Sequence, residues 1–242
     1  MRDAVRDGMR GVLLLAALAA LCVGCGKPTT GLRRREKGLV GHWKFDREGG
    51  STARDSAGLG NDGEIIGATR VAGKEGRALS FTSPRSRVEI PSSEDLKLGR
   101  AITIEAWIRP QDLSEGPRVV LSKNDEYALR IDGPDEGNKL SLFVHVGAPA
   151  VSWEPRASSQ ERPKLNRWQH VVAVWTGSSL RLYVDGKLVG QRRRVGRPNP
   201  TPYPIVIGNW EYPSCHGMRF GGAIDEVKIY NYARTPESPT AP

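Results

Sequence analysis

Residues 167–190 have the sequence RWQHVVAVWTGSSLRLYVDGKLVG, and this stretch decides the fold that we expect for the chain. Residues 168–175 are rich in β-branched and aromatic side chains, which fit the pleated surface of a sheet. Alternate side chains of a strand point to opposite faces, and both faces of this run are largely apolar. We therefore predict a strand inside a sheet that is covered on both sides.

Two turns divide the same stretch into three strands. Gly177 lies in the first turn, residues 176–179, and Asp185-Gly186 forms the second. Asp-Gly between apolar runs favours a type I′ hairpin turn, because both central residues of that turn have positive φ. Residues 180–184 alternate between apolar and polar side chains, as one face of a sheet requires. The stretch thus predicts a meander of three antiparallel strands.

This pattern, W-x-H-V-x-x-x-W followed by a glycine turn and L-x-L-Y-V-D-G-K, resembles the laminin G-like, concanavalin A-like jelly-roll family. Three further segments resemble it in the expected order: residues 40–46, 77–110 and 205–234. The resemblance implies an all-β fold, a concanavalin A-like jelly-roll β-sandwich of two antiparallel sheets. It implies no single function, because the family includes lectin-like binders, adhesion and structural modules, and enzyme domains.

The composition fits one turn-rich β domain. The chain has 242 residues, with 28 glycines and 17 prolines, and sandwiches of this length occur as single units. Cys215 is the one cysteine inside the expected domain, so no disulfide forms within it. The net charge of +9 favours anionic partners, although a solvated surface explains it too. No nucleic-acid motif accompanies the charge, and the sequence indicates no oligomeric state.

Residues 1–24 have the pattern of an export signal. Three arginines precede the apolar run 11–21, which is shorter than the ~20 residues of a typical membrane span. Residues 21–25 resemble a bacterial lipobox, which implies that Cys25 is lipidated and anchors the exported protein to a membrane. Cys22 stands where that motif usually has leucine. Cleavage by the ordinary signal peptidase, or retention of the leader as an anchor, therefore stays open.

The rest of the chain divides into three parts. Residues 25–38 are polar and basic and are expected to form a flexible tether. Residues 39–234 form the expected laminin G-like domain, and residues 235–242 a disordered tail. We expect a lipoprotein in the periplasm or at the cell surface, with secretion as the alternative.

No catalytic pattern is evident. Glycoside hydrolases need two carboxyl groups across the scissile bond, and Glu105 has no carboxylate two or four residues further along its strand. Asp225 and Glu226 are adjacent and should point to opposite faces. His170 is predicted to be a half-buried, hydrogen-bonded histidine rather than a base. The sequence thus indicates a protein that is not an enzyme, with a polysaccharide hydrolase built from cross-strand carboxylates as an alternative.

Oxygen-bearing side chains point to a structural calcium ion. Calcium takes six to eight oxygen ligands, often from irregular loops. The resemblance pairs the first and last strands, which would bring the loop 46–63 to the last strand, and many relatives hold calcium near these elements. The predicted ligands are Asp46, Asp55, Asn61, Asp62 and Asp225. The alternative is that the loop residues among them are ordinary turn formers.

Four aromatic residues lie in polar or proline-rich segments and are candidates for ligand binding: Trp153, Tyr203, Trp210 and Tyr212. An exposed ring there can stack on a sugar, whereas tryptophans within strands fill the core or cover a sheet. Packing within the loops is the alternative explanation. The sequence favours a non-catalytic module that binds a glycan or an anionic envelope polymer. A structural or adhesive envelope component without a small ligand is the other possibility.

Overall fold

The structure is a computed structural model that describes residues 36–147, 152–198, 200–210 and 218–236. The strands in these residues are β1 (Leu39–Trp43), β2 (Thr52–Ala53), β3 (Gly63–Ile66), β4 (Thr69–Ala72), β5 (Arg77–Ser80), β6 (Arg87–Ile90), β7 (Ile102–Pro110), β8 (Arg118–Lys123), β9 (Tyr127–Ile131), β10 (Leu140–Val144), β11 (Ala157–Ser158), β12 (Gln169–Trp175), β13 (Ser179–Val184), β14 (Lys187–Arg193), β15 (Ile205–Ile207) and β16 (Gly222–Tyr230). Two short 3-10 helices are η1 (Glu94–Leu96) and η2 (Pro134–Glu136). Across the described ranges, no helix is long and apolar enough to cross a membrane.

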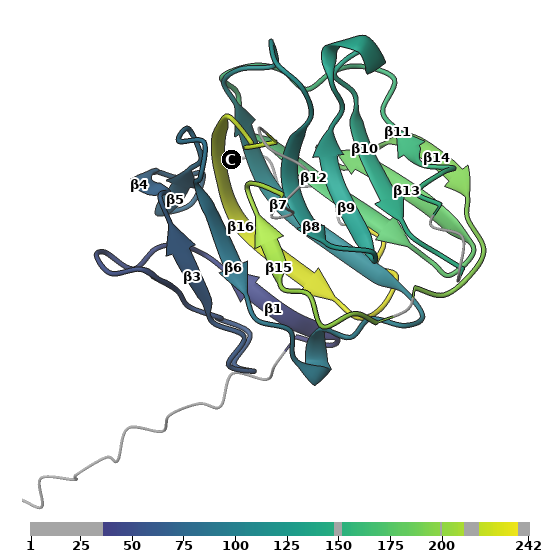
Figure 1. The fold of residues 1–242 in the computed structure, drawn as a ribbon, viewed down its shortest axis with the longest axis horizontal. Coiled ribbons are helices and arrows are strands. Elements are labelled where there is room, and N and C mark those ends of the chain that lie inside the picture. Colours follow the sequence, from purple (N-terminus) through teal and green to yellow (C-terminus); the bar gives the residue numbers. More distant parts are fainter. Residues whose placement is uncertain (1–35, 148–151, 199, 211–217, 237–242) are drawn as a thin grey trace, which may run out of the picture. The chain divides into compact units, whose positions relative to one another are not determined.

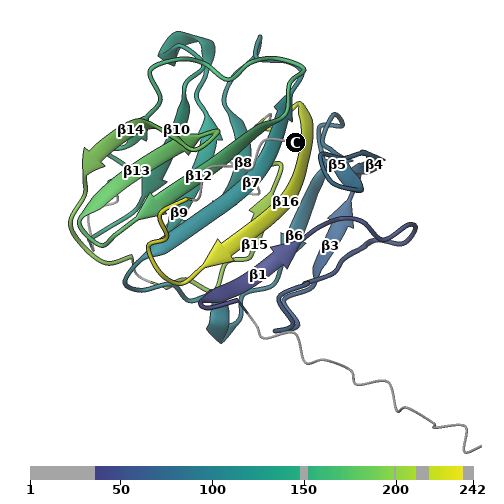
Figure 2. The same cartoon turned by 180° about the vertical axis from the view of Figure 1, so that it is seen from behind.

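The strands form two antiparallel sheets packed face to face (Figures 1 and 2). The first sheet has the order β14-β13-β12-β7-β16-β5-β4, with β1 paired to β16. The second has the order β11-β10-β9-β8-β15-β6-β3-β2 and lies in front in Figure 1. The predicted all-β sandwich of two antiparallel sheets is confirmed, as is the pairing of the first and last strands.

The stretch that decides the fold forms β12, β13 and β14, the predicted meander. All seven residues of β12 are buried, and the strand lies between β7 and β13. Asp185 and Gly186 have φ values of 48° and 77°, as a type I′ turn requires. Gly177 also has positive φ, at 88°, in the turn between β12 and β13. Local turn chemistry and side-chain alternation are therefore sufficient to predict this part of the fold.

The core fills the space between the sheets. Ile104, Ala106 and Ile108 of β7 are fully buried in it, so these alternate side chains form the inward face of β7. Trp43 and Trp175 are also fully buried, and each indole N–H donates to a backbone carbonyl. Burying a large apolar side chain stabilises the fold by about 1.5–3 kcal/mol. Two tryptophans of the strands therefore belong to the core, as expected.

Three short strands have no counterpart in the sequence prediction: β2, β4 and β11. Their residues mix polar and small apolar side chains, and each becomes a strand by pairing with the edge of β3, β5 or β10 respectively. Strand propensity depends strongly on such partners, so local composition does not reveal them. The short helix η1 begins directly after Ser93, whose hydroxyl donates to Asn61 Oδ1 at 2.7 Å instead of capping the helix.

Candidate functional site

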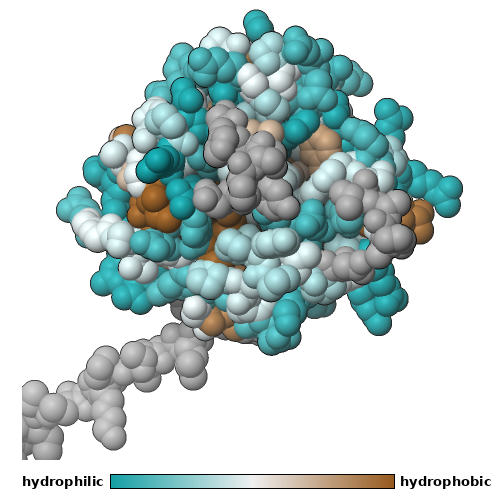
Figure 3. Space-filling view, viewed as in Figure 1, coloured by the Kyte–Doolittle hydropathy of each residue, from teal (hydrophilic) through white to brown (hydrophobic). Residues whose placement is uncertain are grey.

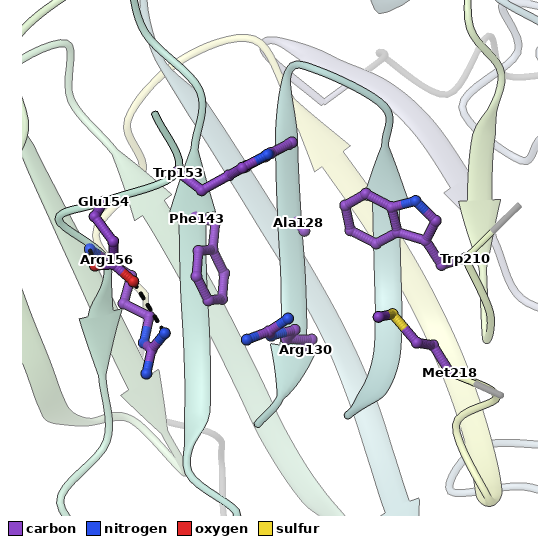
Figure 4. Close-up of a pocket in the computed structure, with 8 residues that line it drawn as sticks. All are labelled: Ala128, Arg130, Phe143, Trp153, Glu154, Arg156, Trp210 and Met218. Atoms are coloured by element: carbon purple, nitrogen blue, oxygen red, sulfur yellow. Dashed lines mark hydrogen bonds and ion pairs between the residues drawn. The ribbon is translucent and has the colours of Figure 1, made fainter. Parts of the chain in front are cut away.

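A cavity of about 320 Å³ opens on the outer face of the second sheet. Ala128 of β9 and Phe143 of β10 are cross-strand partners on that face, since their neighbours Leu129 and Leu142 belong to the core. The lining residues, drawn in Figure 4, are Ala128, Arg130, Phe143, Trp153, Glu154, Arg156, Trp210 and Met218. Segments far apart in the sequence thus build one site on a rigid sheet.

Two of the predicted ligand-binding aromatics meet in this cavity. The ring centroids of Trp153 and Trp210 are 5.9 Å apart, with an interplanar angle of 71°. The His145 ring lies behind Trp153, at 5.4 Å between centroids. Figure 4 shows the Trp153 indole lying across the strands from which Ala128 and Phe143 project, with the Trp210 indole over the strand on the other side of Ala128. Both tryptophans keep part of their surface exposed, so the pair forms an aromatic wall that a ligand can reach.

The floor of the cavity is cationic. Arg130 Cζ lies 4.5 Å from the centroid of the Phe143 ring, and Arg156 Cζ lies 5.2 Å from it. A guanidinium over an aromatic ring contributes about 0.5–1 kcal/mol at partly exposed sites. Phe143 therefore holds two arginines at the base of the cavity. The alternation of apolar residues along the sequence does not reveal this contact.

Three carboxylates hold these arginines in place. Arg130 donates to Asp132 at 2.9 Å and to Glu136 at 3.1 Å. Arg156 binds Glu136 at 2.6 Å and Glu154 at 2.9 Å. Burial by itself lowers the pKa of Arg156, but the charge of Asp132 and the contacts with Glu136 raise that pKa overall. Both guanidinium groups are consequently oriented before a ligand arrives.

A buried arginine positions the segment that carries Trp153. Arg194 is 7% exposed and donates to the carbonyl of Val144 at 3.0 Å. Its other nitrogens donate to the carbonyls of Ser152 and Glu154, on either side of Trp153. The sequence shows Arg194 only as part of a basic cluster, because nothing local distinguishes it from its exposed neighbours.

Trp210 is positioned by the two residues before it. Gly208 has φ +81°, and a Cβ on it would lie 2.1 Å from the Phe81 ring, so only glycine fits there. The Asn209 side chain accepts from the backbone N–H of Trp210 at 2.9 Å and donates to the carbonyl of Pro84 at 3.0 Å. The sequence Gly-Asn-Trp after β15 therefore directs the indole to the outer face of the sheet.

The other predicted ligand-binding residues do not join this site in the described part of the chain. Tyr203 is 37% exposed and does not line the cavity. Tyr212 lies outside the described residues, as does the predicted lipidation site Cys25. The visible apolar surface on this side of the molecule is broken into separate patches among hydrophilic residues (Figure 3). Such a surface suits a small ligand better than a broad protein interface.

Among the predicted calcium ligands, Asp55 and Asp62 organise their own loop. Asp62 accepts from the backbone N–H of Asp55 at 2.8 Å and from the Arg54 guanidinium at 2.8 Å. The Asp55 carboxylate accepts four backbone hydrogen bonds. Their donors, at 2.8–3.2 Å, are His42, Ala57, Leu59 and Asn61. Asn61 itself bonds to Val40 and Ser93. These groups thus perform the turn chemistry that was the alternative explanation.

Asp46 and Asp225 meet a different segment, the turn between β4 and β5. Asp46 accepts from the N–H of Arg77 at 3.0 Å, and Asp225 accepts from those of Lys74 and Glu75 at 2.8 and 3.1 Å. Burial raises the pKa of Asp225 to about 6, although these hydrogen bonds oppose the rise. Within the described ranges, no three His, Cys, Asp or Glu side chains gather as a metal ion would need. The five predicted ligands therefore do not form one cluster, and calcium binding stays a prediction.

Glu105, which stands alone in the sequence, has a histidine and two cationic side chains as neighbours on the outer face of the first sheet. His170 Nε2 lies 3.0 Å from its carboxylate, Arg234 donates to it at 2.9 Å, and Lys228 lies 3.6 Å away. Burial raises the pKa of Glu105, but the hydrogen bond with His170 and the nearby positive charges lower it overall. His170 is 8% exposed and hydrogen-bonded, as predicted. This cluster is an ion network, with Glu105 at its centre.

A bulge interrupts the regular alternation that was expected at Asp225 and Glu226. The pairing of β16 with β7 is irregular between Asp225 and Lys228, and Glu226 has φ +48°. Such a bulge adds a residue and turns side chains away from strict alternation. Glu226 contacts His42 at 2.6 Å, so neither carboxylate joins the hydrophobic core.

The two packed antiparallel sheets define a jelly-roll β-sandwich protein. Residues 82–238 match the family model of the concanavalin A-like lectin/glucanases superfamily, and the chain belongs to this family. The resemblance seen in the sequence is therefore confirmed. A comparison with curated proteins gave no match.

Solved structures share the fold. One is the binding domain of Paraclostridial Mosquitocidal Protein 1, with a TM-score of 0.63 and 15% identity, where the match covers 81% of this chain and 49% of that one. Domain 4 of AbnA, a GH43 extracellular arabinanase from Geobacillus stearothermophilus, was solved in complex with arabinotriose (TM-score 0.63, 21% identity, 84% and 96% covered). A Trypanosoma rangeli sialidase mutant displaying trans-sialidase activity is also similar (TM-score 0.59, 19% identity, 81% and 31% covered). The chain thus spans about half of the first of these proteins and a third of the sialidase.

Proposed function

We propose that this protein is a non-catalytic glycan-binding module, exported and held at a membrane by a lipid on Cys25. The observation that supports glycan binding most directly is the cavity in which Trp153 and Trp210 form a wall above the guanidinium groups of Arg130 and Arg156. Ligand sites typically combine apolar and aromatic walls with a few fixed polar groups, and this cavity has both.

The chemistry of the lining matches that of a sugar ring. The C–H face of a sugar packs on an indole, and the two tryptophans offer such surfaces. Arg130 and Arg156 donate hydrogen bonds to ring and hydroxyl oxygens, and Glu154 accepts them from hydroxyl groups. Because these polar groups already bind one another, they are oriented without a ligand, which lowers the entropic cost of binding.

Hydrolysis at this cavity is disfavoured by its charges. A glycoside hydrolase needs two carboxyl groups on either side of the scissile bond. Among the lining residues, Glu154 is the one carboxylate, and it binds Arg156 at 2.9 Å. The arabinanase domain was solved with arabinotriose, so the structural similarity to it supports sugar binding by this fold class. Because that domain is one part of the arabinanase, the similarity gives no argument for catalysis by this chain.

The proposal is tested by removing the aromatic wall. The full chain in detergent is assayed on a glycan array, and the best ligand is titrated calorimetrically. Trp153→Ala and Trp210→Ala should each weaken affinity at least about tenfold, since an aromatic contact of this kind contributes on the order of 1–3 kcal/mol. Trp168→Ala is the matched control, because Trp168 is half-buried on the first sheet, beside Arg109. Equal affinity in all four proteins, or no glycan bound by the unmodified chain, would contradict the proposal.

A further inference from the structure

Two more cavities continue the aromatic cavity along residues 154–164. The second holds about 570 Å³ and shares Glu154 and Arg156 with the first. The third holds about 380 Å³ and shares Ser159 and Gln160 with the second. Each alone has the size of a small-ligand site. We call the three cavities together the β11 groove, because they follow β11 from the tryptophan pair to Leu188.

The β11 groove crosses from one sheet to the other. β11 is the edge strand of the second sheet and lies against β14, the edge strand of the first (Figure 1). Gly190 of β14 allows this close approach, since a Cβ there would lie 2.4 Å from the carbonyl oxygen of Ser158. The groove therefore follows the contact between β11 and β14, and backbone contacts fix its path.

The charge of the groove changes along its length. At the aromatic end, Glu136 and Glu154 already bind Arg130 and Arg156. Beyond them, the second and third cavities are lined by five cationic side chains, none of which forms an ion pair within the described part of the chain. These are Lys139, Arg162, Lys164, Lys187 and Arg192. Glu161 is the one further carboxylate in this lining, so the positive charge is largely uncompensated.

We propose that the β11 groove binds an acidic polysaccharide as an extended chain. One sugar ring packs against Trp153 and Trp210, and the carboxylate or sulfate groups of the following units meet the unpaired cations. This inference rests on the proposed glycan binding and adds to it the charge of the ligand and its polymeric nature. A neutral chain would leave the five cations without a partner.

The remaining lining groups favour a polysaccharide over other polyanions. Ser158, Ser159, Gln160 and Gln191 supply hydroxyl and amide groups, and Glu154 accepts hydrogen bonds beside Trp153. Sugar hydroxyls use both kinds of partner. A single-stranded nucleic acid would also stack on the tryptophans, but its phosphates would lie close to Glu154 and Glu136. The mixed donors and acceptors therefore fit a hydroxyl-rich anion best.

The inference is tested with the full chain in detergent by affinity electrophoresis against polymers of known charge. The acidic set is polygalacturonate, alginate, hyaluronan and chondroitin sulfate, and the neutral set is dextran, arabinan and xylan. At least one acidic polymer should retard the protein more than every neutral one. Raising NaCl from about 50 to about 500 mM should weaken that affinity at least about tenfold, because exposed charge pairs are screened.

Two double variants separate the groove from the overall charge. Lys139→Gln with Arg192→Gln should weaken affinity for the acidic polymer at least about tenfold. Arg47→Gln with Arg100→Gln removes the same charge from exposed positions outside the groove and should have little effect.

Each result decides between the two proposals. Tight, salt-independent binding of a neutral polymer would overturn the inference that the ligand is an acidic chain. It would leave the proposed glycan binding unaffected. Tighter binding of oligo-dT than of any acidic glycan would also overturn it. If the unmodified chain retards none of these polymers, the acidic-chain inference fails, and the glycan array with the tryptophan variants decides separately whether sugar binding fails as well.

Discussion

Arg194 is not among the residues that line the aromatic cavity, yet it joins the carbonyl groups on both sides of Trp153 to that of Val144. A buried guanidinium that makes three such contacts acts as a brace, because hydrogen bonds to a charged group contribute about 1.5–3 kcal/mol. The orientation of Trp153 therefore depends on a residue 41 positions away in the sequence. At the residue scale, binding rests on side chains that position the aromatic wall.

Replacing Arg194 with methionine should separate positioning from overall charge. We expect Arg194→Met to weaken glycan affinity at least about tenfold, because Ser152 and Glu154 lose their donor and Trp153 is released. Calorimetry measures the affinity, and near-UV circular dichroism measures the packing of the tryptophans. Arg193→Met is the control, since Arg193 is exposed. Equal affinities for both variants would show that Arg194 has no positioning role.

Gly208 and Gly58 allow backbone strain to be distinguished from steric clash. Both have φ +81°, but a Cβ at Gly208 would meet Phe81, whereas a Cβ at Gly58 has open space. Gly58→Ala should cost roughly 1 kcal/mol of unfolding free energy, and Gly208→Ala roughly 3 kcal/mol or more. Chemical denaturation measures both. Equal losses would mean that Phe81 moves aside and that the clash is relieved.

At the scale of elements, Asp225 connects β16, the last strand, to the turn between β4 and β5. Its pKa is about 6 in the folded protein, above the ~3.9 of an unperturbed aspartate. Because the folded state binds this proton more tightly, the resulting stability is full below about pH 4 and is lost as the pH rises through 6. The buried carboxylate therefore makes the folded state less favourable at neutral pH.

Asp225→Asn should remove this pH dependence. Between pH 4 and 7, the melting temperature of the variant should rise relative to that of the unmodified protein, by an amount corresponding to at most about 3 kcal/mol. Glu105→Gln should show the opposite pH dependence. The pKa of Glu105 is lowered, so the stability that this carboxylate contributes to the fold is lost as the pH falls. Thermal melts at closely spaced pH values measure both. A constant difference between Asp225→Asn and the unmodified protein would refute the assignment.

The predicted calcium ion concerns the same elements. If calcium joins the loop after β1 to β16, a hundredfold excess over its dissociation constant should raise the melting temperature by roughly 5–10 °C. Asp46→Ala and Asp225→Ala should then abolish the rise. Asp55→Ala should lower the melting temperature equally with calcium and with chelator, because it removes four backbone hydrogen bonds. A melt that chelator leaves unchanged would end the calcium prediction.

The sequence predicts elements better than it predicts the site. The strands β7, β12 and β13 follow from side-chain alternation and from Asp185-Gly186, both of which are local signals. Trp153 and Trp210 are recognisable because large aromatics are unusual in polar loops. Phe143 is not, since it stands in an apolar strand and resembles a core residue; only the pairing of β9 with β10 shows that it faces outward. Arg130 and Arg156, which lie over the Phe143 ring, are likewise brought together by tertiary contacts.

For the whole molecule, the lipid anchor is the proposal that decides where the module works. Mass spectrometry of the mature protein should find diacylglycerol on Cys25, and Cys25→Ser should move the protein from the membrane fraction to the soluble fraction. Cys22→Ser is the matched control, because it leaves the proposed modification site unchanged. A soluble mature chain that begins at another residue would refute the anchor and favour secretion.

The pairing of β1 with β16 has a consequence for how this domain combines with others. Leu39 lies beside Tyr230, and Glu36 contacts both Tyr230 and Arg234, so the polypeptide enters and leaves the sandwich at one point. A domain with adjacent ends can be inserted into a surface loop of a host protein without forcing that loop apart. The sandwich is therefore suited to insertion within another polypeptide as well as to attachment at one end of it.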